Sequence, residues 1–234
     1  MATVKQELGK RAGRARETRQ RMLGAAYELF CERGFQPASM AAIAERAGVA
    51  VQTVHFTFHT KGRLLNEVLR VYAAGEPEPK PVMERPWMME ALSTRDPRRT
   101  LALVMEYGTD IYARVAPLEP AVLAATFVDP EVADAWSAAK QGRRRGMQQI
   151  IEAIASRGGL APGLTVTRAT DIHFTVHSHE VFLGLTAGCG WTVAEYKAWQ
   201  YENLCHHLLA ENSLQRRRRA ARGLSFEPLV GQGD

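Results

Sequence analysis

The segment GVAVQTVHFTFHTKGRLL, residues 48–65, places the tightest constraint on the fold of this chain. Within it, residues 51–58 form a polar and aromatic stretch of about two helical turns. The segments on either side have apolar residues at helical spacing. Because so short and polar a helix supplies little surface for a core, its side chains are expected to be presented to a partner.

The flanking segments carry helix start and stop signals. Ser39 is a favourable N-cap for the helix before the stretch, and Gly48 supplies the left-handed residue that ends that helix. Thr60 is a favourable N-cap for the helix that follows. A helix, a glycine turn and a short second helix make a helix-turn-helix, whose second helix enters the major groove of DNA.

The side chains of the short helix suit this role. Val54 and Phe58 lie one turn apart and can fix the helix to the core. Glutamine can pair with adenine, threonine can donate to bases or phosphates, and apolar groups can meet the thymine methyl. Lysine and the free amides of a helix start suit a phosphate oxygen. The candidate DNA contacts on these grounds are Gln52, Thr53, His55, Phe56, Thr57 and Lys61.

Positive charge is concentrated in the same third of the chain. Residues 1–75 contain 12 Lys or Arg and 6 Glu, a balance of +6, whereas the whole chain carries +5. Such an excess is the expected footprint of a polyanionic partner. Residues 1–15 lack apolar periodicity and are predicted to be a flexible basic arm. Residues 214–234, with Arg216–Arg219, are predicted to be a basic tail whose role the sequence leaves open.

The remainder of the chain is predicted to be helical. GEPEPKPVMERPW, residues 75–87, has four prolines in thirteen residues and is predicted to be a loop. Helices are predicted over 97–115, 117–126, 130–157, 167–187 and from 193 onward, the last opened by a capping box at Thr192 and Glu195. Because no strand signal competes, the chain is predicted to be all-α.

Nothing in the sequence predicts export or membrane insertion. No stretch approaches eighteen consecutive apolar residues, and the N-terminus lacks the apolar run of a secretory signal. The three cysteines are odd in number and widely spaced, which is typical of reduced thiols. We expect a cytoplasmic protein that makes no membrane contact.

Residues 16–76 resemble the N-terminal domain of TetR-family transcriptional regulators. The resemblance rests on Thr18, Met22-Leu23, Ala25-Ala26, Leu29-Phe30, Gly34-Phe35, Ser39-Met40, Ile43-Ala44, Ala47-Gly48-Val49, Thr53-Val54, Phe58, Lys61 and Leu64-Leu65. The C-terminal part is similar more loosely, through His179-Glu180-Val181-Phe182, Leu185, Gly190-Trp191-Thr192, Tyr196, Trp199 and Leu208-Leu209. The resemblance implies a three-helix helix-turn-helix domain over 16–76, joined by a helix to a larger ligand-binding and dimerisation domain over 77–213.

The resemblance also implies a function. A homodimer joined through helices at about 168–187 and 193–213 would offer two recognition helices to a palindromic operator in double-stranded DNA. A small-molecule effector, whose identity the sequence does not give, would bind the C-terminal domain and release the operator. Repression is the commoner role in the family, and the sequence leaves repressor or activator open. The resemblance adds Ser39, Ala50 and Val51 to the candidate DNA contacts. It implies no cofactor and no enzymatic activity.

Three positions depart from the common family pattern. The family usually has a tyrosine at the position of His55, a histidine at that of Thr57 and a small residue at that of Gln52. The tyrosine and histidine commonly contact phosphates, and His55 and Thr57 can still donate hydrogen bonds. Gln52 is predicted to make a base contact that helps set operator choice.

Aromatic and histidine side chains of the C-terminal domain are candidates to line a ligand cavity, although the same pattern fits ordinary core packing. The candidates are Trp87, Tyr107, Tyr112, Phe127, Trp136, His173 and His177.

Two other classes of function fit part of the sequence. His173 and His177 have the one-turn spacing of a metal site, as a metal-dependent enzyme would require. No HExxH motif accompanies them, and on one continuous helix His179 would point about 200° away from His177. No metal site is therefore predicted. A nucleoid-type DNA-binding protein would bind without operator selectivity and would need no ligand cavity.

Overall fold

The computed structural model describes residues 2–76 and 80–210. Within these ranges the regular structure is helical, and an isolated antiparallel bridge joins Leu160 to Leu209. The all-α prediction is confirmed. None of the helices in the described part of the chain is long and apolar enough to cross a membrane. The predicted tail with Arg216–Arg219 lies outside the described residues.

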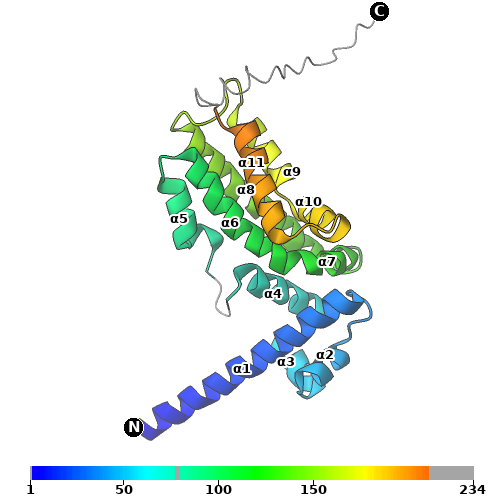
Figure 1. The fold of residues 1–234 in the computed structure, drawn as a ribbon. Coiled ribbons are helices and arrows are strands. Elements are labelled where there is room, and N and C mark those ends of the chain that lie inside the picture. The colour runs from blue at the N-terminus through cyan, green and yellow to red at the C-terminus, as the bar shows by residue number, and fades with distance from the viewer. Residues whose placement is uncertain (1, 77–79, 211–234) are drawn as a thin grey trace, which may run out of the picture.

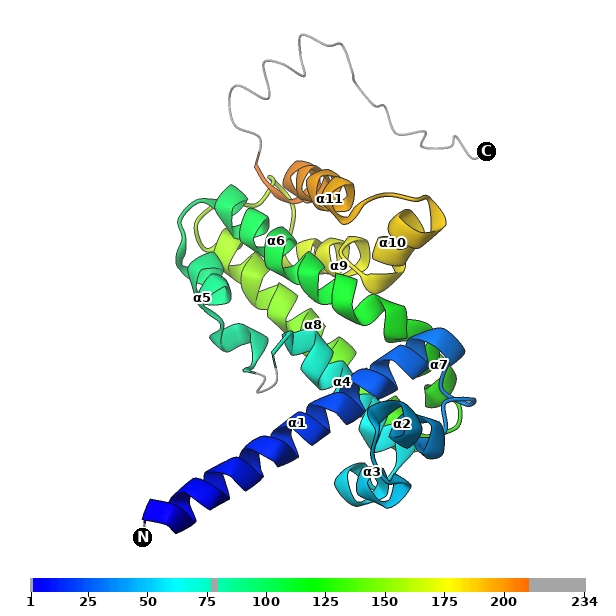
Figure 2. The same cartoon turned by 60° about the horizontal axis from the view of Figure 1, so that its bottom comes forward.

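The helices form two groups with α4 between them (Figure 1). The first group is α1 (Ala2–Arg33), α2 (Met40–Ala47) and α3 (Val51–Phe58), and α4 spans Lys61–Ala74. The second group is η1 (Val82–Glu84), α5 (Pro86–Ser93), α6 (Pro97–Val115), η2 (Ala116–Leu118), α7 (Glu119–Thr126), α8 (Pro130–Ala155), α9 (Val166–Val176), α10 (His179–Leu183), the π-helical turn η3 (Gly184–Gly188) and α11 (Val193–Leu208). Helix α1 packs across α4 (Figure 2).

Local capping explains where the helices around α3 begin and end. The Ser39 hydroxyl accepts a hydrogen bond from the Ala42 amide at 3.1 Å, and Thr60 accepts from the Arg63 amide at 3.1 Å. Gly48 ends α2 with a φ of 64°. Thr192 and Glu195 form the predicted capping box at the start of α11. The structure confirms these predictions. They could be made from the sequence because each depends only on neighbouring residues.

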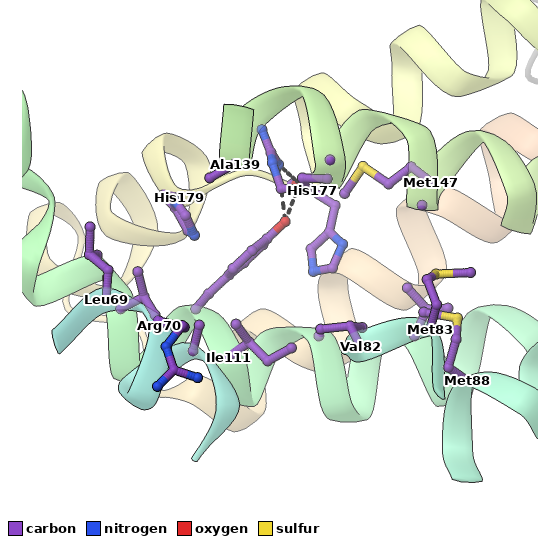
Figure 3. Close-up of a pocket in the computed structure, with 18 of the residues that line it drawn as sticks. Leu69, Arg70, Val82, Met83, Met88, Ile111, Ala139, Met147, His177 and His179 are labelled. Carbon is purple, nitrogen blue, oxygen red and sulfur yellow. Dashed lines mark hydrogen bonds between the residues drawn. The ribbon is translucent and has the colours of Figure 1, made fainter. Parts of the chain in front are cut away.

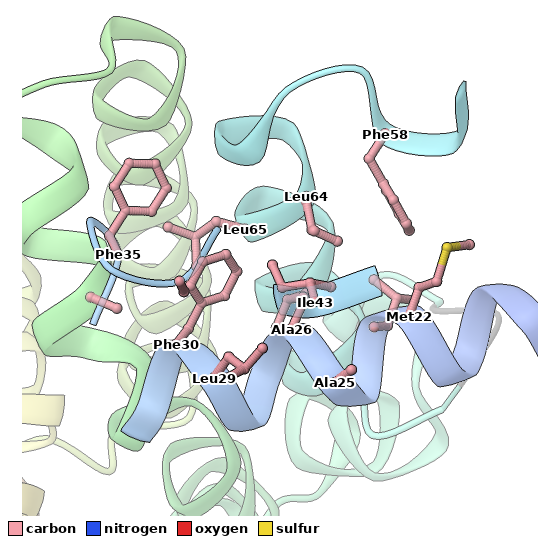
Figure 4. Close-up of a cluster of buried hydrophobic side chains, with 14 of the residues drawn as sticks. Met22, Ala25, Ala26, Leu29, Phe30, Phe35, Ile43, Phe58, Leu64 and Leu65 are labelled. Atoms are coloured by element: carbon pink, nitrogen blue, oxygen red, sulfur yellow. The ribbon is translucent and has the colours of Figure 1, made fainter. Parts of the chain in front are cut away.

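One apolar core joins the head, which consists of α1–α4, to the C-terminal domain. Figure 4 shows Phe58 of α3 and Leu64 of α4 packed over α1, where Met22 and Phe30 are buried. The same cluster continues into Leu118, Ala121, Val122 and Ala125 of η2 and α7, and into Val132 of α8. Because the core is continuous, a rearrangement of α7 or α8 changes what α1 and α4 pack against.

The prediction of a flexible arm over residues 1–15 is wrong in the described part of that segment. Helix α1 begins at Ala2 and continues to Arg33 without interruption. The segment is rich in Ala, Lys, Arg, Gln and Glu, which have high helix propensity, and this propensity outweighs the lack of an apolar face. The basic residues of the segment therefore belong to a helix.

The predicted continuous helix over 167–187 is also wrong, because it breaks after Val176. His177 has the non-helical angles φ −93° and ψ 78°, and Ser178 is the N-cap of the next helix, α10. Tyr112 and Arg143 both donate to the carbonyl oxygen of His177, each at 2.8 Å. This carbonyl is satisfied by side chains from α6 and α8 instead of by a helical amide.

The predicted loop over 75–87 is shorter in the structure. Helix α5 begins at Pro86, which occupies the first helical position, where a proline lacks only an amide that has no helical partner anyway. Met88 and Ala91 of α5 are buried against α6 and α8. This packing, which is not visible in the local sequence, stabilises the short helix.

Candidate nucleic-acid interface and interior cavity

Helix α3 presents a polar and aromatic face outside the core. Val54 and Phe58 are buried, as predicted, and hold the helix against the head. Gln52 and His55 are exposed, and the Phe56 side chain is 85% exposed. An exposed phenylalanine of this extent adds nothing to the core, so it is available to a partner surface. The predicted contact residues Gln52, His55 and Phe56 are therefore accessible on the outer face of α3.

The remaining predicted contacts flank this face. Ser39 and Ala50 are exposed N-cap residues of α2 and α3. Val51 is half-buried against the head core. Thr53 is half-buried, and the Thr57 hydroxyl donates to the Thr53 carbonyl oxygen at 2.7 Å. The proton expected to be available from Thr57 is thus used within the helix, and its oxygen is left as an acceptor.

A tight turn with unusual backbone geometry ends the recognition helix. His59 has φ 64° and ψ −58°, and the Thr60 amide donates to the Phe58 carbonyl oxygen at 2.7 Å. This is a γ-turn with positive φ, a rare and strained conformation for a residue other than glycine. The turn sets the angle between α3 and α4, and no local sequence signal predicted it.

The Lys61 ammonium, which the sequence predicts to contact a phosphate, already has two hydrogen-bond partners within the protein. It donates to the carbonyl oxygens of Phe35 and Gln36, at 2.7 and 3.0 Å, and lies 4.3 Å from the centre of the Phe35 ring. Partial burial lowers the pKa of Lys61. Two of its three N–H donors therefore brace the α1–α2 connection, and one is left for a phosphate.

Lys61→Ala is expected to lower the free energy of unfolding by about 1–3 kcal/mol, because two carbonyl oxygens lose a charged donor. Chemical denaturation compared with exposed Lys80→Ala as a control measures the effect. A denaturation midpoint that equals that of the control would contradict the bracing role of Lys61.

Arginines of α1 lie beside the recognition helix. A groove between the two helices is lined on one side by Arg11, Arg14, Arg16 and Arg19 and on the other by Thr53 and Thr57. The charge count predicted the basic character of this segment. Because residues 1–15 were expected to be flexible, no fixed position beside α3 was predicted for the arginines. Because α1 is helical here, its arginines are held in a fixed position relative to α3.

A cavity of about 510 Å³ lies inside the C-terminal domain and reaches α4. Figure 3 shows Met83, Met88 and Met147 at one end, Leu69 and Arg70 of α4 at the other, and His177 between them. Its volume falls within the range of about 300–1,000 Å³ typical of small-molecule sites. Most of its lining is apolar, and methionine side chains adapt readily to the shape of a bound molecule.

The polar groups of the cavity gather around Tyr112. Its hydroxyl donates to the His177 carbonyl oxygen and accepts from Arg143 Nη1 at 3.0 Å. The rings of His177 and His179 both lie 4.5 Å from the Tyr112 ring, and the Trp136 ring lies 6.1 Å from that of His179. Burial, with Arg143 nearby, lowers the pKa of His179 to about 4 and that of His177 well below its usual value. Both imidazoles are therefore neutral at physiological pH.

The structure brings together four of the seven predicted cavity residues, Trp87, Tyr112, Trp136 and His177. The other three lie elsewhere. Phe127 is 88% exposed, Tyr107 is exposed and stacks on Trp87 with ring centres 5.3 Å apart, and His173 is buried behind His177. Helical spacing alone does not tell which face of each helix meets the cavity, so these predictions are corrected.

His179 lines the same cavity as His177, contrary to the expectation that it points away. The break at residues 177–178 removes the continuous helix on which that expectation depended. His173 and His177 stack with ring centres 5.6 Å apart. Across residues 2–76 and 80–210, no group of three or more His, Cys, Asp or Glu side chains is arranged to hold a metal ion.

Comparisons with known proteins agree with this geometry. Residues 22–68 match the family model described as bacterial regulatory proteins, tetR family. A search of curated protein sequences gave no match. Among solved structures, native NalD, a repressor of a multidrug efflux pump in Pseudomonas aeruginosa, is 22% identical, with a TM-score of 0.62 over 85% of this chain and 100% of NalD.

Two further structures of similar fold were solved with small molecules. A Saccharomonospora viridis protein in complex with choline is 18% identical, with a TM-score of 0.65 over 83% of this chain and 99% of that one. FadR from Bacillus subtilis in complex with stearoyl-CoA is 18% identical, with a TM-score of 0.60 over 80% of this chain and 97% of FadR.

The fold and the exposed second helix define an all-α helix-turn-helix DNA-binding protein. Residues 22–68 belong to the TetR family of bacterial regulatory proteins, and the chain as a whole shares the fold of the similar solved structures. The matched domain is that of a DNA-binding transcriptional regulator, so the metal-dependent enzyme considered from the sequence is set aside.

Proposed function

We propose that this protein is a ligand-responsive, sequence-specific repressor. A homodimer binds a palindromic operator through α3, and a small molecule entering the cavity releases the DNA. The observation that carries the proposal is the double role of α4. Helix α4 lines the cavity through Asn66, Leu69, Arg70 and Ala73. The same helix contributes Leu64, Leu65 and Val68 to the core beneath α3.

The form of the cavity supports the ligand-binding part of the proposal. It is enclosed by elements from both sides of the α4 connection and has the volume of a small-molecule site. The Saccharomonospora viridis and Bacillus subtilis proteins hold choline and stearoyl-CoA respectively. A ligand shifts the balance between two head spacings only by its difference in affinity for them.

Dimerisation is proposed through α9, α10, η3 and α11. These elements lie together on one outer side of the C-terminal domain (Figure 1). They correspond to the expected helices at about 168–187 and 193–213, although the first is divided at residues 177–178 and residues 211–213 lie outside the described ranges. A two-fold interface places two copies of α3 for two half-sites, which is why a palindromic operator is expected.

An ion-pair chain offers a physical connection from the cavity to the recognition helix. Arg70, which lines the cavity, donates to both carboxylate oxygens of Glu67, at 2.6 and 2.8 Å. The same carboxylate accepts from Arg19 of α1 at 2.5 Å. The Arg19 guanidinium lies 4.8 Å from the centre of the Phe58 ring at the end of α3. Displacement of Arg70 by a ligand would thus change the position of Glu67 and Arg19, and with it the contact that Arg19 makes with Phe58 of α3.

Glu67→Gln is expected to reduce the effect of a cavity ligand on operator affinity by about 0.5–2 kcal/mol. The measurement is operator affinity with and without ligand for each variant. Glu131→Gln is the matched control, because it weakens the exposed α4–α8 pair between Arg63 and Glu131. If both variants change the ligand effect equally, Glu67 has no special part in coupling.

Selection of bound sequences from random double-stranded DNA tests the proposed function. The proposal predicts enrichment of an inverted repeat whose half-sites lie one helical turn or more apart. Binding without enrichment of any sequence would overturn it in favour of a nucleoid-type protein.

A further inference from the structure

The hydrogen-bonding groups of the cavity differ in whether they already have partners. The Tyr112 hydroxyl is used twice, as donor to the His177 carbonyl oxygen and as acceptor from Arg143. Arg143 Nη1 also donates to the carbonyl oxygens of His177 and Phe174, at 2.8 and 3.4 Å. The Tyr112 hydroxyl and Arg143 Nη1 therefore hold the break after α9 in place, and their hydrogen bonds are made within the protein.

Other buried groups of the same cavity lack partners. Among the residues that the structure describes, neither ring nitrogen of His177 has a hydrogen-bond partner, and neither does Trp136 Nε1. His177 is fully buried, and its ring lies in the middle of the cavity (Figure 3). A buried polar atom without a partner costs about 1–3 kcal/mol, so such groups in a cavity indicate what a ligand must supply.

The indole and the neutral imidazole define complementary groups on the ligand. Trp136 Nε1 can only donate, so it requires an acceptor. The neutral ring of His177 has one donor and one acceptor, and a hydroxyl or carbonyl group can pair with it. The two side chains are connected through His179 and Tyr112: the His179 ring lies beside those of Trp136 and Tyr112, and the Tyr112 ring lies beside that of His177. Apart from Asn66 and Arg70 of α4, the rest of the lining offers mainly apolar contact.

The charge of the cavity disfavours an ionic ligand. None of its described lining residues is Asp or Glu, so a cation finds no carboxylate partner. The two lining cations already have partners. Glu67 pairs with Arg70, and Arg143 Nη1 donates to the Tyr112 hydroxyl and to the carbonyl oxygens of His177 and Phe174. Burying an anion without a free cationic partner is costly.

We propose that the effector is an uncharged, elongated and mainly apolar molecule with an oxygen-containing polar group that pairs with Trp136 Nε1 and the His177 imidazole. The apolar part extends toward Met83, Met88 and Met147. This inference rests on the proposed function, because it assigns a chemical class to the ligand of that cavity. It predicts a preference opposite to that of a site for quaternary ammonium or carboxylate compounds.

Three probes with the same alkyl chain test the proposed class: decanol, decanoate and decyltrimethylammonium. Each is titrated against the full-length protein loaded with the fluorescent apolar compound N-phenylnaphthylamine. Decanol is expected to displace N-phenylnaphthylamine at a concentration at least about tenfold lower than that needed for either ionic probe. The ionic head groups lose their hydration on entering the cavity without gaining a partner there. Tighter binding of decanoate or decyltrimethylammonium would overturn the assigned class and leave the cavity as a ligand site.

Two variants test the assigned atoms. Trp136→Phe and His177→Phe remove the hydrogen-bonding nitrogens and keep an aromatic ring, so each is expected to weaken decanol binding about five- to tenfold. Trp191→Phe, outside the cavity, is the control and is expected to bind as the wild type does. Unchanged binding in both cavity variants would overturn the pairing. Failure of the wild-type protein to bind N-phenylnaphthylamine or any of the probes would overturn the effector site itself, and with it the proposed function.

Discussion

Gly62→Ala is expected to lower the free energy of unfolding by about 2–4 kcal/mol and to weaken operator binding. Gly62 lies in the first turn of α4, where that helix meets the start of α8. An added Cβ would lie 2.8 Å from Cγ of Asp129, closer still to its Oδ2, and 3.1 Å from Cγ2 of Val132. Asp129 caps α8 by accepting from the amides of Glu131 and Val132, so it cannot move away without loss of the cap.

Thermal and urea denaturation measure the effect, with Gly24→Ala as the matched control. Gly24 is also helical, but an added Cβ there meets no atom within 4 Å among those described. Alanine is the better helix former, so the control is expected to be as stable as the wild type or up to about 1 kcal/mol more stable. Equal stability of the two variants would contradict the close approach of α4 and α8.

Gln52→Ala is expected to weaken binding to the selected operator by about 1–3 kcal/mol, or about five- to 150-fold, and to change random-DNA binding little. The physical reason is the exposed position of Gln52 on α3, where its amide can pair with a base edge. Titration of operator and random duplexes at one fixed salt concentration measures both affinities, since salt changes the phosphate contribution.

Gln149→Ala, at an exposed position on α8, is the control for the loss of an amide side chain. An equal loss of affinity for operator and random DNA in Gln52→Ala would place base readout elsewhere on α3. Phe56 would then be the first residue to test, because its ring is the most exposed aromatic group of the helix.

The features that the sequence predicted well depend on local chemistry. The caps at Ser39, Thr60 and Thr192 and the turn at Gly48 follow from side chains and amides within three or four residues of one another. The burial of Val54 and Phe58 follows from helical spacing. This is why the helix-turn-helix could be located before the structure was known.

The features that the sequence missed depend on contacts between distant segments. The break at His177 is held by Tyr112 and Arg143 from two other helices, and no pattern near residue 177 shows it. That break brings His179 into the cavity, where a continuous helix would exclude it. The bracing contacts of Lys61 were missed for a similar reason, because its partners are carbonyl oxygens 25 and 26 residues away.

The most direct test of ligand-responsive DNA binding is the dissociation constant for the selected operator across a titration with decanol. Displacement of N-phenylnaphthylamine in the same samples reports whether the cavity is occupied. Ligand-responsive DNA binding predicts that operator affinity falls by about five- to 150-fold as the cavity fills, which corresponds to typical coupling free energies. An operator affinity that stays constant while the cavity fills would contradict it.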